Sequence, residues 1–168
     1  GKPGKERLIV VDLGVAFPDM DGSPGVDLII ADISWLIERR DQIEAVFITH
    51  AHEDHVGAVA HTYEQLQAPI YARRFTANIA ARKMAEHHHP DDAVNVVSVW
   101  PEQVSAGPFT VGFLPISHSI PESSALVIDT PEGRVIHSGD FKIDLTPAWG
   151  SLMTPSFGRR FARTASKR

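Results

Sequence analysis

Apolar residues along this chain gather in short runs that are separated by turn-forming residues. Residues 8–14 are mostly apolar, include a β-branched run and end in glycine, which predicts a buried strand. Residues 26–30 form a second short apolar run after a segment rich in Asp, Gly and Pro, so we expect a loop and then a short strand. Residues 33–40 have apolar positions at helical spacing and end in two arginines, which predicts a short helix. That helix leads into a further predicted strand over residues 45–49.

The middle of the chain has helical periodicity. Residues 69–72 predict a brief strand, and the Ala-rich residues 76–88 predict a helix with Thr76 as its amino-terminal cap. The three histidines at its end, 87–89, are interpreted as part of a solvated face rather than as metal ligands. Residues 56–67 predict an earlier, amphipathic helix, because one face carries Val56, Val59, Ala60, Tyr63 and Leu66.

From residue 93 onward the pattern changes to short β-type runs that Pro and Gly divide. The runs cover residues 94–100, 109–117, 125–130 and 134–137, and they predict antiparallel strands with tight turns. Strand-rich segments on both sides of two helices predict an α/β (α+β) fold, with helices packed outside mixed sheets.

Length and composition fit a single folded domain, because 168 residues with 43% hydrophobic content can bury a sizeable core. The chain has no cysteine, which excludes thiolate ligands and disulfides and leads us to expect a cytoplasmic protein. No apolar run reaches the roughly 18–20 residues of a transmembrane helix, so we expect neither a membrane span nor a signal peptide.

Charge divides the chain into two unlike parts. Residues 1–150 hold 11 basic and 21 acidic residues, whereas residues 151–168 hold five basic residues and no acidic one. We therefore expect a domain over residues 1–150 and a basic tail over residues 151–168 that lies outside the fold. The overall charge of −5 is not typical of a nucleic-acid-binding protein.

The densest chemistry lies between the strand at 45–49 and the helix that follows it. His50, His52, Asp54 and His55 fall within six consecutive positions. Neutral imidazoles and carboxylates suit borderline divalent ions, and a tight strand-to-helix turn lets such closely spaced residues converge. The segment is interpreted as a metal-binding loop. The alternative, a polar exposed turn, predicts no further ligands downstream.

Further ligands do occur downstream, each at the end of a predicted strand. His118 follows the strand at 109–117, and Asp140 follows the strand that ends near His137. Asp140 is preceded by Gly139, whose missing side chain permits a close backbone approach. A lone histidine is often structural, but strand ends that carry a His cluster, a His and a Gly-Asp pair favour a metal centre.

These residues and their flanks resemble the ribonuclease J family, in the β-CASP branch of the metallo-β-lactamase superfamily. The resemblance covers about residues 7 to 150 and implies the amino-terminal part of a metallo-β-lactamase αββα sandwich. The motifs that carry it are Asp-Leu-Gly at 12–14, Pro-Gly-Val-Asp at 24–27, Thr-His-Ala-His-Glu-Asp-His-Val-Gly-Ala at 49–58, Ser-His-Ser-Ile-Pro-Glu-Ser at 117–123 and His-Ser-Gly-Asp-Phe-Lys-Ile-Asp at 137–144.

The resemblance implies a site for two divalent ions, zinc or else manganese. The first ion would be held by His50, His52 and His118, and the second by Asp54 and His55, with Asp140 bridging the two. A water or hydroxide between the ions would attack an RNA phosphodiester, with Asp54 and His55 as catalytic residues. Residues expected to orient the imidazoles from behind are Thr49, Ser117 and Ser138.

Two alternatives stay open. The metal ligands are shared across the superfamily, so the substrate of such a hydrolase could instead be a thioester, lactone or lactam. The chain also departs from the family pattern, because it lacks the later histidine of the second metal site and the RNA-gripping β-CASP domain. We therefore also consider a truncated or frame-shifted fragment that binds metal without turnover and depends on a partner, either a homo-oligomer or a full-length family member.

Overall fold

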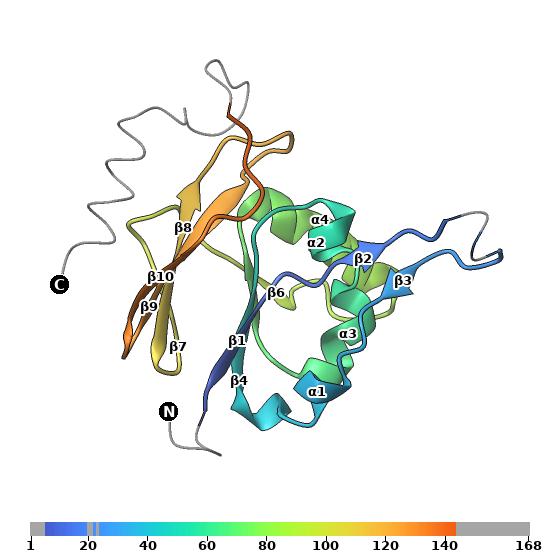
Figure 1. Ribbon diagram of the computed structural model, residues 1–168, viewed down its shortest axis with the longest axis horizontal. Coiled ribbons are helices and arrows are strands. Elements are labelled where there is room, and N and C mark those ends of the chain that lie inside the picture. Colours follow the sequence, from blue (N-terminus) through green and yellow to red (C-terminus); the bar gives the residue numbers. More distant parts are fainter. Residues whose placement is uncertain (1–5, 20–21, 23, 144–168) are drawn as a thin grey trace.

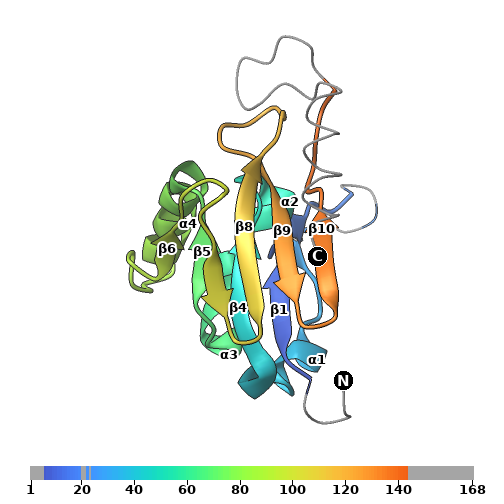
Figure 2. The same ribbon diagram turned by 90° about the vertical axis from the view of Figure 1, so that its left-hand side faces the viewer.

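Two four-stranded sheets face each other in the computed structural model, which describes residues 6–19, 22 and 24–143 (Figures 1 and 2). One sheet is entirely parallel and has the order β1-β4-β5-β6. The other is antiparallel and has the order β10-β9-β8-β7. The strands are β1 (Leu8–Val11), β4 (Ile43–Ile48), β5 (Ile70–Ala72), β6 (Val94–Val96), β7 (Val104–Ala106), β8 (Phe109–Pro115), β9 (Ser124–Thr130) and β10 (Gly133–His137).

The described helices all lie on the outer face of the parallel sheet, and the antiparallel sheet covers its other face (Figure 1). A small antiparallel pair, β2 (Val15–Ala16) and β3 (Ile29–Ile30), extends from the same side as an arm. No helix in the described ranges is long and apolar enough to cross a membrane. The helices are α1 (Ser34–Ile37), the 3-10 turn η1 (Arg40–Gln42), α2 (Glu53–Val56), α3 (Val59–Leu66) and α4 (Arg74–Glu86).

Strand β4 lies at the centre of the molecule and is apolar on both faces. Its residues Val46 and Ile48 pack into the core beneath the helices. Its residues Ala45 and Phe47 face the core between the two sheets, where the Phe47 ring lies 6.1 Å from that of Phe113. A strand covered on both sides reads as an almost continuous apolar run, which is why this segment is so hydrophobic.

The predicted α/β (α+β) class, with helices outside mixed sheets, is confirmed, but the strand prediction over residues 94–100 is wrong in length and partner. Only β6 forms, and it pairs in parallel with β5. Val99 makes just an isolated bridge to Phe113, and β7 was not predicted. The helix α4 carries the chain across the sheet between β5 and β6, which makes a parallel pairing possible.

The helix boundaries also differ from those predicted. The segment at 56–67 divides at residues 57–58 into α2, which begins earlier at Glu53, and α3. The expected helix at 33–40 is reduced to α1 and η1. Thr76 is not a cap but a buried residue inside α4, which begins at Arg74. The expected tail at 151–168 lies outside the described residues.

Candidate metal centre

The three strand ends that lead to predicted ligands meet at one edge of the sandwich. Strand β4 runs into the loop that holds His50 and His52, and the short helix α2 carries Asp54 and His55. The antiparallel strands β8 and β10 point the same way and lead to His118 and Asp140. A main-chain hydrogen bond of 3.1 Å, from Ser124 N to the Thr49 carbonyl, ties the two sheets together at this edge.

Three imidazole nitrogens converge on one point. His52 Nδ1 lies 3.1 Å from His50 Nε2 and 3.1 Å from His118 Nε2. Tetrahedral zinc with nitrogens at about 2.05 Å requires ligand atoms about 3.4 Å apart. The spacing of the three rings therefore fits one divalent ion with only a small outward adjustment, and it brings together the three histidines expected to share an ion.

A second set of ligand atoms adjoins the first and consists of His50, His55 and Asp140. His55 Nε2 lies 3.3 Å from Asp140 Oδ2 and 3.6 Å from Asp54 Oδ2. Asp54 belongs to neither converging set, and its side chain is 67% exposed. Asp54 thus stands at the rim of the site, beside His55, rather than within it.

Asp12, at the end of β1, connects the two sets from behind. Its Oδ1 accepts the Thr49 amide at 2.7 Å, and its Oδ2 accepts both the Thr49 hydroxyl at 2.9 Å and His55 Nδ1 at 2.7 Å. Because the Thr49 hydroxyl donates its proton to Asp12, the hydroxyl oxygen is free to accept a hydrogen bond from His50 Nδ1, which lies 3.0 Å away. Both His50 and His55 therefore carry their proton on Nδ1 and direct the Nε2 lone pair into the site.

The surroundings also set the charge of these rings. Burial, together with the imidazoles of His55, His118 and His52, lowers the pKa of His50 to about 4. Burial likewise lowers the pKa of His118, whereas the hydrogen bond to Asp12 raises the pKa of His55. His50 is therefore neutral at physiological pH, the form in which an imidazole binds a metal ion.

The Asp-Leu-Gly segment at 12–14 forms a cradle for α2. Leu13 N donates to the His55 carbonyl at 2.7 Å, and the Leu13 carbonyl accepts from Ala58 N at 2.8 Å. A Cβ on Gly14 would lie 1.7 Å from the Asp54 carbonyl oxygen, so only glycine fits there. These contacts end α2 after a single turn and place Asp54 and His55 at the site.

The expected supporting residues have different outcomes. Thr49 orients His50, as predicted, and Gly139 has a φ of +59°, with a Cβ position only 2.9 Å from the Ser124 carbonyl oxygen. Ser117 acts through its main chain, since its carbonyl accepts from Lys142 N at 2.7 Å. Ser138 donates to the Gly139 carbonyl rather than to an imidazole. Sequence reasoning gave Asp12 no role at the site, although a carboxylate directly after a predicted strand was a usable signal.

The histidines at the end of α4 lie apart from this centre. His87 and His88 are exposed, in line with a solvated face. His89 is partly buried, and its Nε2 lies 3.0 Å from the Ala60 carbonyl oxygen, so for this residue the expectation is wrong. The reason is local packing, since the His89 ring lies 5.2 Å from that of Tyr63 on α3.

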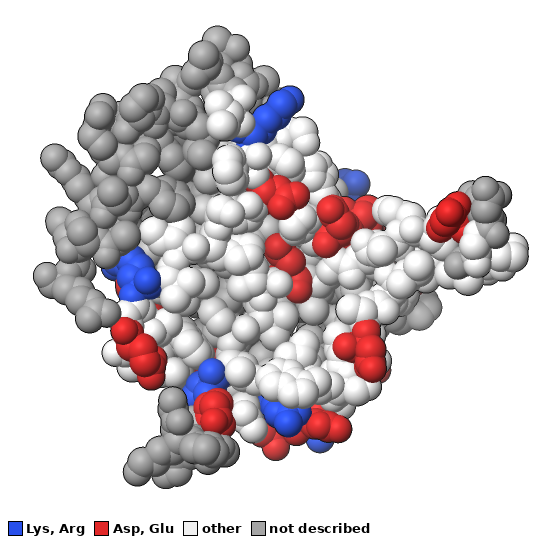
Figure 3. Space-filling model, in the orientation of Figure 1, with Lys and Arg blue, Asp and Glu red and all other residues white. Residues whose placement is uncertain are grey.

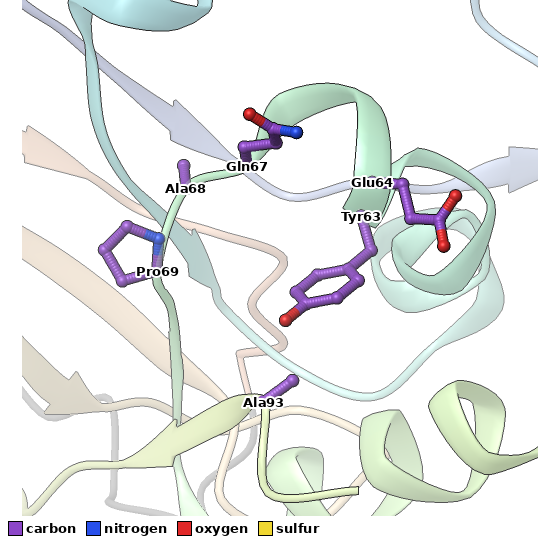
Figure 4. A pocket seen from close by; sticks show the side chains of 6 residues that line it. All are labelled: Tyr63, Glu64, Gln67, Ala68, Pro69 and Ala93. Carbon is purple, nitrogen blue, oxygen red and sulfur yellow. The ribbon is translucent and has the colours of Figure 1, made fainter. Parts of the chain in front are cut away.

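An open hollow of about 660 Å³ lies at the opposite edge of the parallel sheet, where strands β5 and β6 begin (Figure 4). It contains no member of either ligand set, so it is separate from the metal centre. The hollow is lined by Tyr63, Glu64, Gln67, Ala68, Pro69 and Ala93.

On the face shown in Figure 3, acidic side chains gather around the position of α2, and the basic ones lie nearer the rim.

Comparison with known proteins gives a consistent result. The model of the metallo-beta-lactamase superfamily matches residues 4–162. Ribonuclease J of Sinorhizobium meliloti is 43% identical over 156 residues, which are 93% of this chain and 28% of that protein. Ribonuclease J of Corynebacterium glutamicum is 41% identical over 145 residues, which are 86% of this chain and 20% of that protein. The chain thus spans between a fifth and a third of the length of these relatives.

Solved structures support the fold. A metallo-beta-lactamase HARLDQ-motif mutant from Cronobacter sakazakii matches with a TM-score of 0.54 at 18% identity. The match covers 82% of this chain and 58% of the other. At this level of identity the likeness concerns the architecture of the two sheets and their helices alone.

Proposed function

Since this chain belongs to the metallo-beta-lactamase superfamily, we propose that it is a metal-dependent hydrolase that cleaves RNA phosphodiester bonds. The observation that carries the hydrolase proposal is the convergence of His50, His52 and His118, with two of its spacings at 3.1 Å. The choice of RNA is supported by the relatives that are called Ribonuclease J.

We further propose that the centre holds two divalent ions. Support comes from the two adjoining ligand sets. The His50 Nε2 lone pair serves one ion, so the second ion would be held by His55 and Asp140. The first set contains only imidazole nitrogens, which suits zinc, whereas the second includes the carboxylate of Asp140 and also accommodates manganese. Bound ions of this kind would supply a water of lowered pKa and neutralise charge on the phosphodiester.

The residues around the centre have distinct roles in this proposal. Asp12 and Thr49 hold the rings of His50 and His55 with Nε2 directed inward. Asp54 is exposed beside His55 and would accept the proton of the attacking water. Acidic groups near α2 would repel an RNA backbone, so substrate binding at this face would depend on neutralisation by cations.

We propose a cytoplasmic setting, because the absence of cysteine is consistent with a reducing compartment.

We also propose association with a second copy or with a longer family member. Support comes from apolar side chains near the end of the described chain, since Val135 is 53% exposed and Ile143 is 77% exposed. Light scattering of the purified protein over a range of concentrations would test this association.

The proposed activity predicts that the protein, once loaded with zinc or manganese, hydrolyses 5′-monophosphorylated RNA and that a chelator stops the reaction. His52→Ala should abolish hydrolysis, because His52 Nδ1 faces both other imidazoles of the first set. His88→Asn is the matched control: it changes an exposed histidine outside the centre and keeps a residue that tolerates the φ of +62° found there.

Other substrates distinguish the alternatives in the same assay. Hydrolysis of a thioester, lactone or lactam without cleavage of RNA would replace the RNA proposal with a different hydrolase of this superfamily. Metal binding without turnover of any of these substrates would indicate a fragment that binds metal but is not an enzyme. RNA cleavage that survives both the chelator and His52→Ala would contradict the proposal.

A further inference from the structure

The loop between β8 and β9 carries His118, yet the His118 ring has little support of its own. Its Nδ1 is buried and has no hydrogen-bond partner among the described residues. The corresponding nitrogens of His50 and His55 are held by Thr49 and Asp12. The position of His118 must therefore be set by the backbone of its loop, which makes the anchors of that loop important.

The strongest side-chain anchor of the loop is Glu122, four residues after His118. Its Oε2 accepts the main-chain N–H of Phe75 at 2.6 Å, and its Oε1 accepts Arg73 Nη2 at 3.1 Å. Arg73 and Phe75 flank Arg74, the first residue of α4. Helix α4 lies on the parallel sheet, at the same end of the molecule as the loop between β8 and β9 (Figure 2). One carboxylate thus ties a loop of the antiparallel sheet to a helix of the other layer.

The start of α4 needs such a partner. The residue before the helix, Arg73, makes no capping hydrogen bond with its side chain, and Thr76 lies too far inside the helix to do so. A carboxylate at the amino end of a helix is favoured by the helix dipole and by the unpaired N–H groups there. Glu122 supplies this carboxylate from 47 positions away in the sequence.

Charge and backbone conformation indicate that this contact is specific. Partial burial tends to raise the pKa of Glu122, but the Phe75 amide and the Arg73 guanidinium outweigh it and hold that pKa below its ordinary value. Glu122 also has a φ of +59°, a conformation that a non-glycine residue adopts at a cost and keeps only when its surroundings hold it. The Ser124 hydroxyl provides part of that hold, because it donates to the Glu122 carbonyl at 3.1 Å.

We propose that Glu122 is a positioning residue for the metal centre, which fixes the loop of His118 against the amino end of α4. The inference rests on the proposed metal centre and adds to it a structural support that acts through the backbone. A merely stabilising role for Glu122 would lower the stability of the fold and leave the coordination by His118 unchanged. The two roles are therefore separated by a readout at the metal.

The test is a titration of the purified metal-free protein with Co²⁺, followed by visible absorption, because the spectrum reports the ligands around the ion. Glu122→Gln keeps an oxygen for Phe75 N–H but loses the charge, and it should weaken binding at the three-histidine set about 10-fold. Glu122→Ala loses both and should weaken binding further. The Co²⁺ spectrum of each variant should shift toward that of His118→Ala, which lacks the ligand itself.

The matched control is Glu86→Gln, which makes the same chemical change at an exposed position on the same helix. It should leave both the affinity and the spectrum unchanged. If both Glu122 variants fail to fold, Arg73→Met provides the test. It releases one of the two bonds to Glu122 and removes two buried nitrogens that have no hydrogen-bond partner among the described residues, so the protein should fold and show a smaller loss in the same direction.

Folded Glu122→Ala or Arg73→Met protein with the parent affinity and spectrum would overturn the inference. Failure of the proposed function has a different signature, because no RNA is used in this titration. A parent protein that binds Co²⁺ but does not cleave RNA would contradict only the proposed function, and the role of Glu122 would still be decided by the spectra.

Discussion

Gly14→Ala is expected to lower the free energy of unfolding by about 3 kcal/mol and to remove the second metal-binding set. The new Cβ would lie 1.7 Å from the carbonyl oxygen and 2.1 Å from the carbonyl carbon of Asp54. Both are backbone atoms, so no side-chain rotation relieves the clash and α2 must move. That movement breaks the hydrogen bond from Leu13 N to the His55 carbonyl and withdraws His55 from the site.

Thermal melting and metal content of the same preparation would check this result. Gly22→Ala is the matched control, because a Cβ at Gly22 meets no atom of the described residues within 4 Å. His50, His52 and His118 do not lie on α2, so the first set should survive in whatever Gly14→Ala protein folds. Parent stability and parent metal content in Gly14→Ala would show that the cradle does not position α2.

Asp12→Asn is expected to weaken metal binding by about 10- to 100-fold with little change in the backbone. Asn tolerates the φ of +63° at this position and can still accept the Thr49 amide. Its NH2 group, however, would face the Thr49 hydroxyl and His55 Nδ1, which both donate to Asp12 Oδ2 in the parent. His55 would then have to place its proton on Nε2, where the metal ligand atom is needed.

Competition with a chromophoric chelator measures this affinity directly. Asp27→Asn makes the same substitution at an exposed position and should have the parent affinity. An unchanged affinity in Asp12→Asn would mean that the imidazoles need no fixed proton position to bind metal. Such a result would show that Asp12, Thr49 and His50 do not act as one network in metal binding.

Sequence reasoning identified candidate ligands because they lie at strand ends or in the turn that follows one, and the structure brings His50, His52, His55, His118 and Asp140 together. It did not find the support behind them. Asp12 acts across 37 positions on Thr49, and Glu122 caps a helix 47 positions away. Such contacts depend on how the two sheets pack, and no local pattern reports them.

The errors in the fold have the same origin. The apolar face at 56–67 predicts one helix, but hydrogen bonds to Leu13 end its first turn at Val56. The sequence pattern groups β6 with the antiparallel strands that follow it, whereas α4 returns the chain to the parallel sheet. Periodicity indicated where elements occur, whereas tertiary contacts decided where they end and which strands they join.

Elemental analysis of the purified, dialysed protein tests the metal centre most directly. The two adjoining ligand sets predict about two zinc or manganese ions per chain. Asp140→Ala should reduce the content to about one ion, because it leaves the three-histidine set complete, and His52→Ala should lose the ion of that set. A protein that folds, contains all of these residues and retains no divalent metal after incubation with zinc or manganese would contradict the account.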